Sequence, residues 1–132
     1  MGQAGAAWVW SHAAAVAAGA ALGALLRWWL SLALNPSWSG FHLGTLAANC
    51  LGGALIGLAM VWFARSPHEA LRLLLVTGFL GGFTTFSAFS AESLGLLQRG
   101  TWALALLHSG AHVLGALAST ALGFALGRWL WR

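Results

Sequence analysis

The sequence predicts an all-α membrane protein in which residues 1–132 form a single domain of four transmembrane helices. Apolar residues make up 60% of the chain and charged residues 6%, whereas an ordinary soluble domain is about 25% charged. A chain this short cannot bury so many apolar side chains in one aqueous core. Four apolar stretches reach the length of about 20 residues that a helix needs to cross a bilayer.

The four predicted spans are separated by short connections. They are Ala13–Leu34, Gly44–Ala64, Leu71–Leu97 and Thr101–Gly127. The first has no charged segment before it and continues past Arg27, so we interpret it as a retained span rather than a signal peptide. It ends at Asn35-Pro36, where proline removes a backbone donor. The third is the longest and becomes polar in its second half.

Tryptophan and arginine support a membrane setting. Most of the indole rings lie near predicted span ends, where amphipathic rings favour the interface, although each could instead pack in an apolar helix contact. The nine are Trp8, Trp10, Trp28, Trp29, Trp38, Trp62, Trp102, Trp129 and Trp131. The net charge is +4, and the arginines that give rise to it are scattered along the chain. The sequence therefore has no basic patch of the kind that binds nucleic acid.

The remaining composition argues against catalysis and Cys chemistry. Cys50 is the only cysteine, so one chain has neither a disulfide framework nor a zinc site built from cysteines. The chain has two Glu, no Asp, and no motif that would join a Ser to a His. The sequence therefore predicts that the protein is not an enzyme.

Small residues recur four apart in every predicted span. The pairs are Gly19/Gly23, Gly53/Gly57, Gly78/Gly82 and Gly123/Gly127. Such pairs allow helix backbones to approach closely in lipid. We interpret them as packing positions.

The third span carries the most informative segment, TGFLGGFTTFSAFSAE over residues 77–92. We expect Gly81-Gly82 to break the helix in the middle of the membrane. A break frees backbone carbonyls, which must then be buried in protein, bind an ion or line water. The alternative is a glycine pair used only for packing, with the hydroxyl groups bonding back to their own helix.

Other polar and aromatic side chains have two open interpretations each. Arg27 either extends to the interface or faces an aqueous vestibule. Asn49 either holds a neighbouring helix or offers its N–H groups to an anion. Phe86 and Phe89 share a helix face, and their positive ring edges could stabilise a small anion, although packing is the ordinary role.

Two histidines share a face of the fourth span. His108 and His112 are four residues apart, a spacing that suits a metal pair. No acidic residue or cysteine accompanies them on that helix, so a metal or haem role is the less favoured interpretation.

Three segments together resemble the Fluc (CrcB) fluoride channels. They are GALLRW over residues 23–28, GTLAAN over residues 44–49, and the segment 77–92. The resemblance covers nearly the whole chain. It implies a fluoride-selective channel that passively exports fluoride across the bacterial cytoplasmic (inner) membrane and so relieves fluoride toxicity.

The resemblance also implies an assembly and a set of site residues. Members form antiparallel, dual-topology homodimers with two pores and one central structural sodium ion. By motif position, backbone carbonyls of Gly81 and Thr84 would hold the sodium. The fluoride pathway would include Arg27, Asn49, Phe86, Ser87, Phe89 and Thr120. Ala116 stands where the family carries a second hydroxyl group on the fourth span.

Two other functions remain as alternatives. A small multidrug exporter also has four helices, but it needs a carboxylate within the membrane, and Glu92 near the end of the third span is the only candidate. A membrane anchor or haem-bearing subunit of a larger complex would use His108 and His112.

Overall fold

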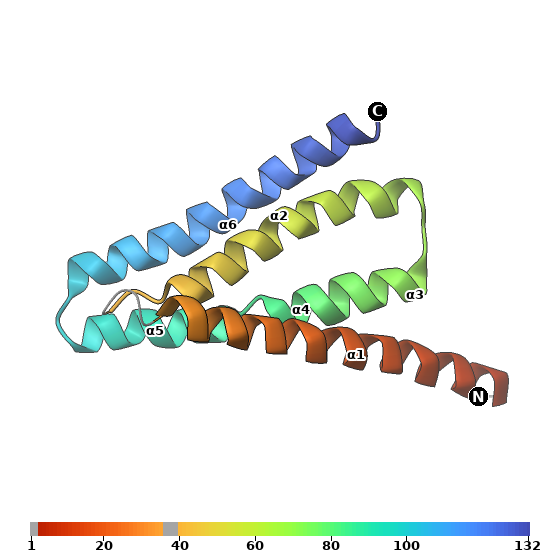
Figure 1. The fold of residues 1–132 in the computed structure, drawn as a ribbon, viewed down its shortest axis with the longest axis horizontal. Coiled ribbons are helices and arrows are strands. Elements are labelled where there is room, and N and C mark those ends of the chain that lie inside the picture. Colours follow the sequence, from red (N-terminus) through yellow and green to blue (C-terminus); the bar gives the residue numbers. More distant parts are fainter. Residues whose placement is uncertain (1–2, 36–39) are drawn as a thin grey trace.

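The computed structural model describes residues 3–35 and 40–132, and within these residues the regular structure is entirely helical (Figure 1). Helices α1 (Gln3–Leu34), α2 (Leu43–Arg65) and α6 (Trp102–Leu130) are continuous. The third long segment runs from Glu69 to Gln98. All four are long and apolar enough to cross a membrane, which confirms the predicted all-α, four-span architecture. Pro36 and Trp38 lie outside the described residues.

The limits of the second and fourth spans agree with the prediction, but the start of the first was wrong. Helix α1 begins at Gln3 rather than Ala13. The polar residues before Ala13 do not end the helix because they bond back to it. Ser11 Oγ donates to Trp8 O at 2.8 Å, and His12 Nδ1 lies 2.7 Å from the same carbonyl oxygen.

The third segment is built from four helical pieces. They are α3 (Glu69–Arg72), the π-helical η2 (Leu73–Leu80), α4 (Gly81–Phe83) and α5 (Phe86–Gln98). Between α4 and α5 the backbone is extended, with ψ 158° at Thr84 and ψ 121° at Thr85. The expected break at Gly81-Gly82 was therefore misplaced, since both glycines are helical and the extended residues follow them.

Gly82 serves close packing instead, as do the other glycines of the four-apart pairs, whereas a Cβ atom on Gly81 would have room. A Cβ atom on Gly82 would collide with the backbone of Ala20 in α1, and one on Gly23 would collide with the backbone of Phe79. On the other side of the molecule, a Cβ atom on Gly57 or Gly123 would collide with the facing backbone across the α2–α6 contact. The predicted packing role of the small-residue pairs is confirmed.

We expect Gly23→Ala to destabilise the protein by about 1–3 kcal/mol, the usual cost of overpacking. The added methyl group has backbone rather than a flexible side chain in front of it. Thermal unfolding of the purified protein in detergent measures the effect. Gly110→Ala is the matched control, because a Cβ atom there meets nothing within 4 Å. Equal midpoints for the two variants would contradict the packing argument.

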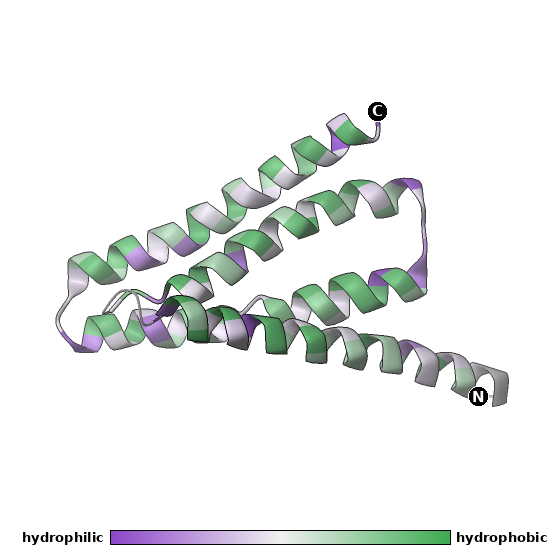
Figure 2. Ribbon diagram, viewed as in Figure 1, coloured by the Kyte–Doolittle hydropathy of each residue, from purple (hydrophilic) through white to green (hydrophobic). Residues whose placement is uncertain are grey.

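The helices form two pairs that diverge toward one end of the molecule. Figure 1 shows α6 along α2, and α1 along the third segment. Between α2 and η2 lies an open cavity of about 580 Å³, lined in part by Ile56, Phe63, Arg72 and Val76. Hydrophobic residues cover the helices along their lengths, and hydrophilic ones gather at the turn between α2 and α3 (Figure 2). Such surfaces suit contact with lipid or with another protein.

Candidate functional site

Asn49 holds the extended residues of the third segment from the side. Its Oδ1 accepts a hydrogen bond from Thr85 N at 2.8 Å, and its Nδ2 donates to Thr85 O at 3.0 Å. Together these bonds satisfy both backbone groups of a residue that has left the helix. Of the two interpretations open for Asn49, the structure shows the one in which it joins two spans.

The same contacts redirect two backbone donors. In a continuous helix the N–H of Thr85 would bond to Gly81 O, and that of Ala88 would bond to Thr84 O. Here Thr85 N donates to Asn49 Oδ1, and Ala88 N donates to Thr85 Oγ1 at 3.2 Å. The carbonyl groups of Gly81 and Thr84 thereby lose their usual helical donors.

Gly81 and Thr84 also face an open space. Both residues line a cavity of about 290 Å³ on the side of the molecule where α2 and η2 diverge. Asn49, Gly52 and Gly53 line the opposite wall from α2. A Cβ atom on Gly52 would collide with the Thr84 side chain. Glycine at position 52 therefore lets the extended residues approach α2.

Arg27 is fixed to the same part of the third segment. Its Nε donates a hydrogen bond to Gly82 O at 3.2 Å, and the side chain is half-buried. The guanidinium group of Arg27 thus satisfies the carbonyl oxygen of Gly82, which lies just before the extended residues. The contact places a positive charge beside α4.

Phe86 and Phe89 meet on one face of α5, as their spacing predicts. The ring centroids lie 5.4 Å apart, with an edge-on interplanar angle of 63°. Phe86 is 79% exposed, whereas Phe89 is half-buried and stacks on His112 at 4.7 Å. His112 Nδ1 in turn lies 3.1 Å from Asn49 Nδ2. Asn49, His112 and the two phenylalanines therefore form one connected group.

Two other predicted pathway residues lie in different surroundings. Ser87 is exposed, and its Oγ lies 3.2 Å from Thr85 Oγ1. Thr120 donates to Ala116 O in its own helix at 2.9 Å. A Cβ atom on Gly53 would lie 3.0 Å from Thr120 Oγ1, so Thr120 faces α2. The described contacts do not join Thr120 to the phenylalanines.

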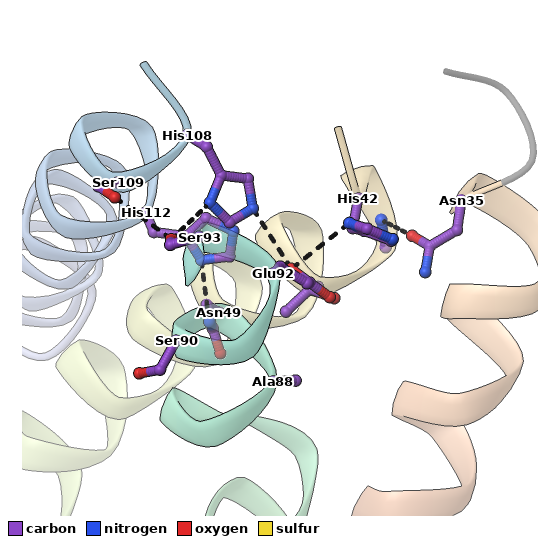
Figure 3. Close-up of polar contacts among 12 residues, drawn as sticks. Asn35, His42, Asn49, Ala88, Ser90, Glu92, Ser93, His108, Ser109 and His112 are labelled. Atoms are coloured by element: carbon purple, nitrogen blue, oxygen red, sulfur yellow. Dashed lines mark hydrogen bonds and ion pairs between the residues drawn. The ribbon is translucent and has the colours of Figure 1, made fainter. Parts of the chain in front are cut away.

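A buried polar cluster adjoins this group, and sequence reasoning found only part of it. His108 is fully buried, and its Nε2 lies 3.3 Å from Glu92 Oε2 (Figure 3). Thr45 Oγ1 donates to Glu92 Oε1 at 2.6 Å. The spacing of His108 and His112 predicted their shared face, but their acidic partner comes from α5. No local pattern joins Glu92 to a helix that begins ten residues later.

Comparisons with known proteins agree with the resemblance seen in the sequence. The family model described as CrcB-like protein, Camphor Resistance (CrcB), matches residues 14–124. A protein of Aromatoleum aromaticum named fluoride-specific ion channel FluC is 55% identical over 113 residues, covering 84% of this chain and 86% of that protein. A protein of Pseudomonas aeruginosa with the same name is 49% identical over 124 residues, covering 92% and 98%.

Proposed function

The chain belongs to the CrcB family of multi-pass bacterial membrane proteins, and we propose that it is a fluoride-selective channel which exports fluoride passively. Relatives at about half identity carry the name fluoride-specific ion channel FluC. The observation that carries the proposal is the Asn49 clamp on Thr85, beside the edge-on pair of Phe86 and Phe89. This group joins three helices at the only extended backbone described within the long segments.

The chemistry of the group suits a small, strongly hydrated anion. A pore for fluoride must replace lost water with N–H groups, O–H groups and the positive edges of aromatic rings. The exposed ring of Phe86 and the adjacent Phe89 supply ring edges. Asn49 Nδ2 supplies an N–H group that would donate to fluoride instead of to His112 Nδ1.

The other predicted pathway residues have supporting roles. Ser87 offers an exposed hydroxyl group next to Phe86. Arg27, bonded to Gly82 O, adds positive potential that draws anions toward the third segment. Thr120 would extend the polar path along α6, and Ala116 leaves that path without a second hydroxyl group. Transport should survive, since the clamp and both phenylalanines remain.

A structural sodium ion at Gly81 and Thr84 completes the proposal. Sodium prefers oxygen ligands, and backbone carbonyl oxygens that have lost their helical donors are free to bind it. The diversion of two N–H donors, to Asn49 and to the Thr85 hydroxyl, supports these two carbonyls as ligands. When bound, the ion supplies positive charge and joins the carbonyls of two chains.

An antiparallel, dual-topology homodimer would bring those two chains together and give two pores. The cavities between α2 and η2 support such a partner, because they open a largely apolar face on which Gly81 and Thr84 lie. A single chain contributes only two freed carbonyls, too few to replace the hydration shell of a cation. A second copy doubles the number.

Removing sodium should therefore weaken the assembly. We expect purified dimer, exchanged into buffer with N-methylglucamine as the only cation, to unfold at a lower temperature than in sodium buffer. The loss should be reversed by sodium and not by the larger caesium ion. Identical unfolding curves in N-methylglucamine, sodium and caesium buffers would contradict the sodium site. Fluoride conduction is measured separately from this experiment.

The transport function can be tested in cells. A bacterial strain that lacks its own fluoride exporter should regain growth in fluoride medium when it expresses this chain. Asn49→Leu should fail to restore growth at equal membrane abundance. No rescue by the abundant wild-type protein would contradict the proposal.

A further inference from the structure

Three buried ligand atoms in the polar cluster make no hydrogen bond within the described part of the chain. Glu92 Oε2, His108 Nε2 and His112 Nε2 are each buried and have no hydrogen-bond partner among the described residues. His108 and His112 are 0% and 3% exposed. One ligand atom from each of the three residues lies within 4.8 Å of the others. Glu92 Oε2 and His108 Nε2 contact each other as an ion pair at 3.3 Å, whereas His112 Nε2 has no partner among the described residues. Buried polar atoms without hydrogen bonds are costly, so this group points to a ligand.

We propose that Glu92, His108 and His112 form a binding site for a divalent transition metal ion such as Zn²⁺ or Co²⁺. Two imidazole nitrogens and one carboxylate oxygen are ligands that these ions accept. Tetrahedral zinc with bonds of about 2.0–2.1 Å requires ligand atoms about 3.3 Å apart. His108 Nε2 and Glu92 Oε2 already lie 3.3 Å apart. A ligand atom of His112 lies within 4.8 Å of a ligand atom of each of the other two residues, so it would move closer on binding.

The surrounding contacts resemble those that orient metal ligands. His108 Nδ1 lies 2.9 Å from Ser93 Oγ, which accepts a hydrogen bond from Ser109 Oγ at 3.2 Å. The second carboxylate oxygen of Glu92 accepts from Thr45. Such second partners fix the ring and carboxylate orientations that metal binding needs. Figure 3 shows one ring nitrogen of His108 directed to Ser93 and the other directed to Glu92.

His42 lies beside the cluster and would act as an entry point or as a fourth ligand. Its Nδ1 lies 3.9 Å from Glu92 Oε2, and its side chain is 39% exposed. An ion arriving from the end of the bundle would meet His42 and Glu92 before the buried histidines. Three protein ligands plus water or His42 complete a tetrahedral site.

Metal binding would also act on the proposed pore. A neutral imidazole that binds a metal through Nε2 carries its proton on Nδ1. The two bonds to Thr85 fix the orientation of the Asn49 amide, so that Nδ2 faces His112 Nδ1 and donates to it. In the metal-free protein His112 Nδ1 is therefore an acceptor and carries no proton. Binding at His112 Nε2 therefore breaks the Asn49–His112 hydrogen bond. Asn49 Nδ2 is then free for fluoride, but the divalent cation beside it would hold the anion more tightly, so occupancy should slow fluoride flux.

Titration of the purified, metal-free full-length chain with Co²⁺ and Zn²⁺ tests the site. We expect one ion per chain, with the visible absorption of tetrahedral Co²⁺. His108→Gln, His112→Gln and Glu92→Gln should each weaken binding at least about tenfold, the loss of one ligand. His68→Gln is the matched control, because His68 is exposed at the turn between α2 and α3. Size-exclusion profiles show whether each variant is folded.

Absence of saturable binding to the wild-type chain would overturn the proposal, as would equal affinities of the wild type and the folded cluster variants. This measurement needs no fluoride transport, so it can fail or succeed independently of the proposed channel. Zn²⁺ at a saturating concentration should reduce fluoride efflux through the wild type. Unchanged efflux would contradict the link through Asn49.

Discussion

Asn49→Leu should reduce fluoride flux by about a hundredfold or more and also destabilise the protein. Leucine matches the side-chain volume approximately but removes bonds to Thr85 N, Thr85 O and His112. Each buried polar group left unpaired costs about 1–3 kcal/mol, and about 3 kcal/mol of lost stabilisation on the path slows passage roughly a hundredfold. Fluoride efflux from proteoliposomes and thermal unfolding measure the two effects.

A matched control separates the clamp from polarity in general. Ser90→Ala removes one side-chain hydrogen bond, from Ser90 Oγ to Phe86 O, at an exposed position of α5, the helix that follows the extended residues. It should keep most of the flux and stability. If Asn49→Leu conducts as well as Ser90→Ala, Asn49 has neither the structural nor the transport role assigned to it.

Phe86→Ile should lower flux about two- to tenfold with little loss of stability. The ring is 79% exposed, so its replacement leaves no cavity in the chain. Isoleucine keeps an apolar side chain but removes the positive ring edge, an interaction of about 0.5–1.5 kcal/mol for aromatic contacts. Parallel measurements of fluoride efflux and unfolding temperature distinguish a role in conduction from a role in packing.

An exposed aromatic ring outside the motif is the control for Phe86. Trp102 is 65% exposed at the start of α6, and Trp102→Leu should leave flux near the wild-type level. Equal fluxes of Phe86→Ile and the wild type would remove Phe86 from the proposed pathway. A drop in unfolding temperature matching the drop in flux would assign it to packing instead.

The four-span fold could be predicted because span length and composition are local properties. Residues 43–65 and 102–130 are continuous apolar runs with little polar interruption. The start of α1 was harder, since Ser11 and His12 suggest an end on polarity alone. Their bonds to Trp8 O satisfy them within the helix, and hydropathy does not register such bonds.

The site was predicted in its residue types but not in its contacts. Gly81 and Gly82 suggested a break at that position. In the structure Gly82 instead allows the backbone of Ala20 in α1 to pack closely against it. The extended backbone falls at Thr84 and Thr85 because Asn49, 36 residues away, replaces the lost helical bonds. Such pairing between distant spans leaves no periodic signal in one sequence.

Release of fluoride and chloride from proteoliposomes of the purified protein, followed with two ion-selective electrodes in parallel, tests the central claim most directly. The account predicts rapid fluoride release with chloride retained, without nucleotide and without an imposed proton gradient. Retention of fluoride by folded, dimeric protein, or equal release of both ions, would contradict the proposal that this chain forms a fluoride-selective channel.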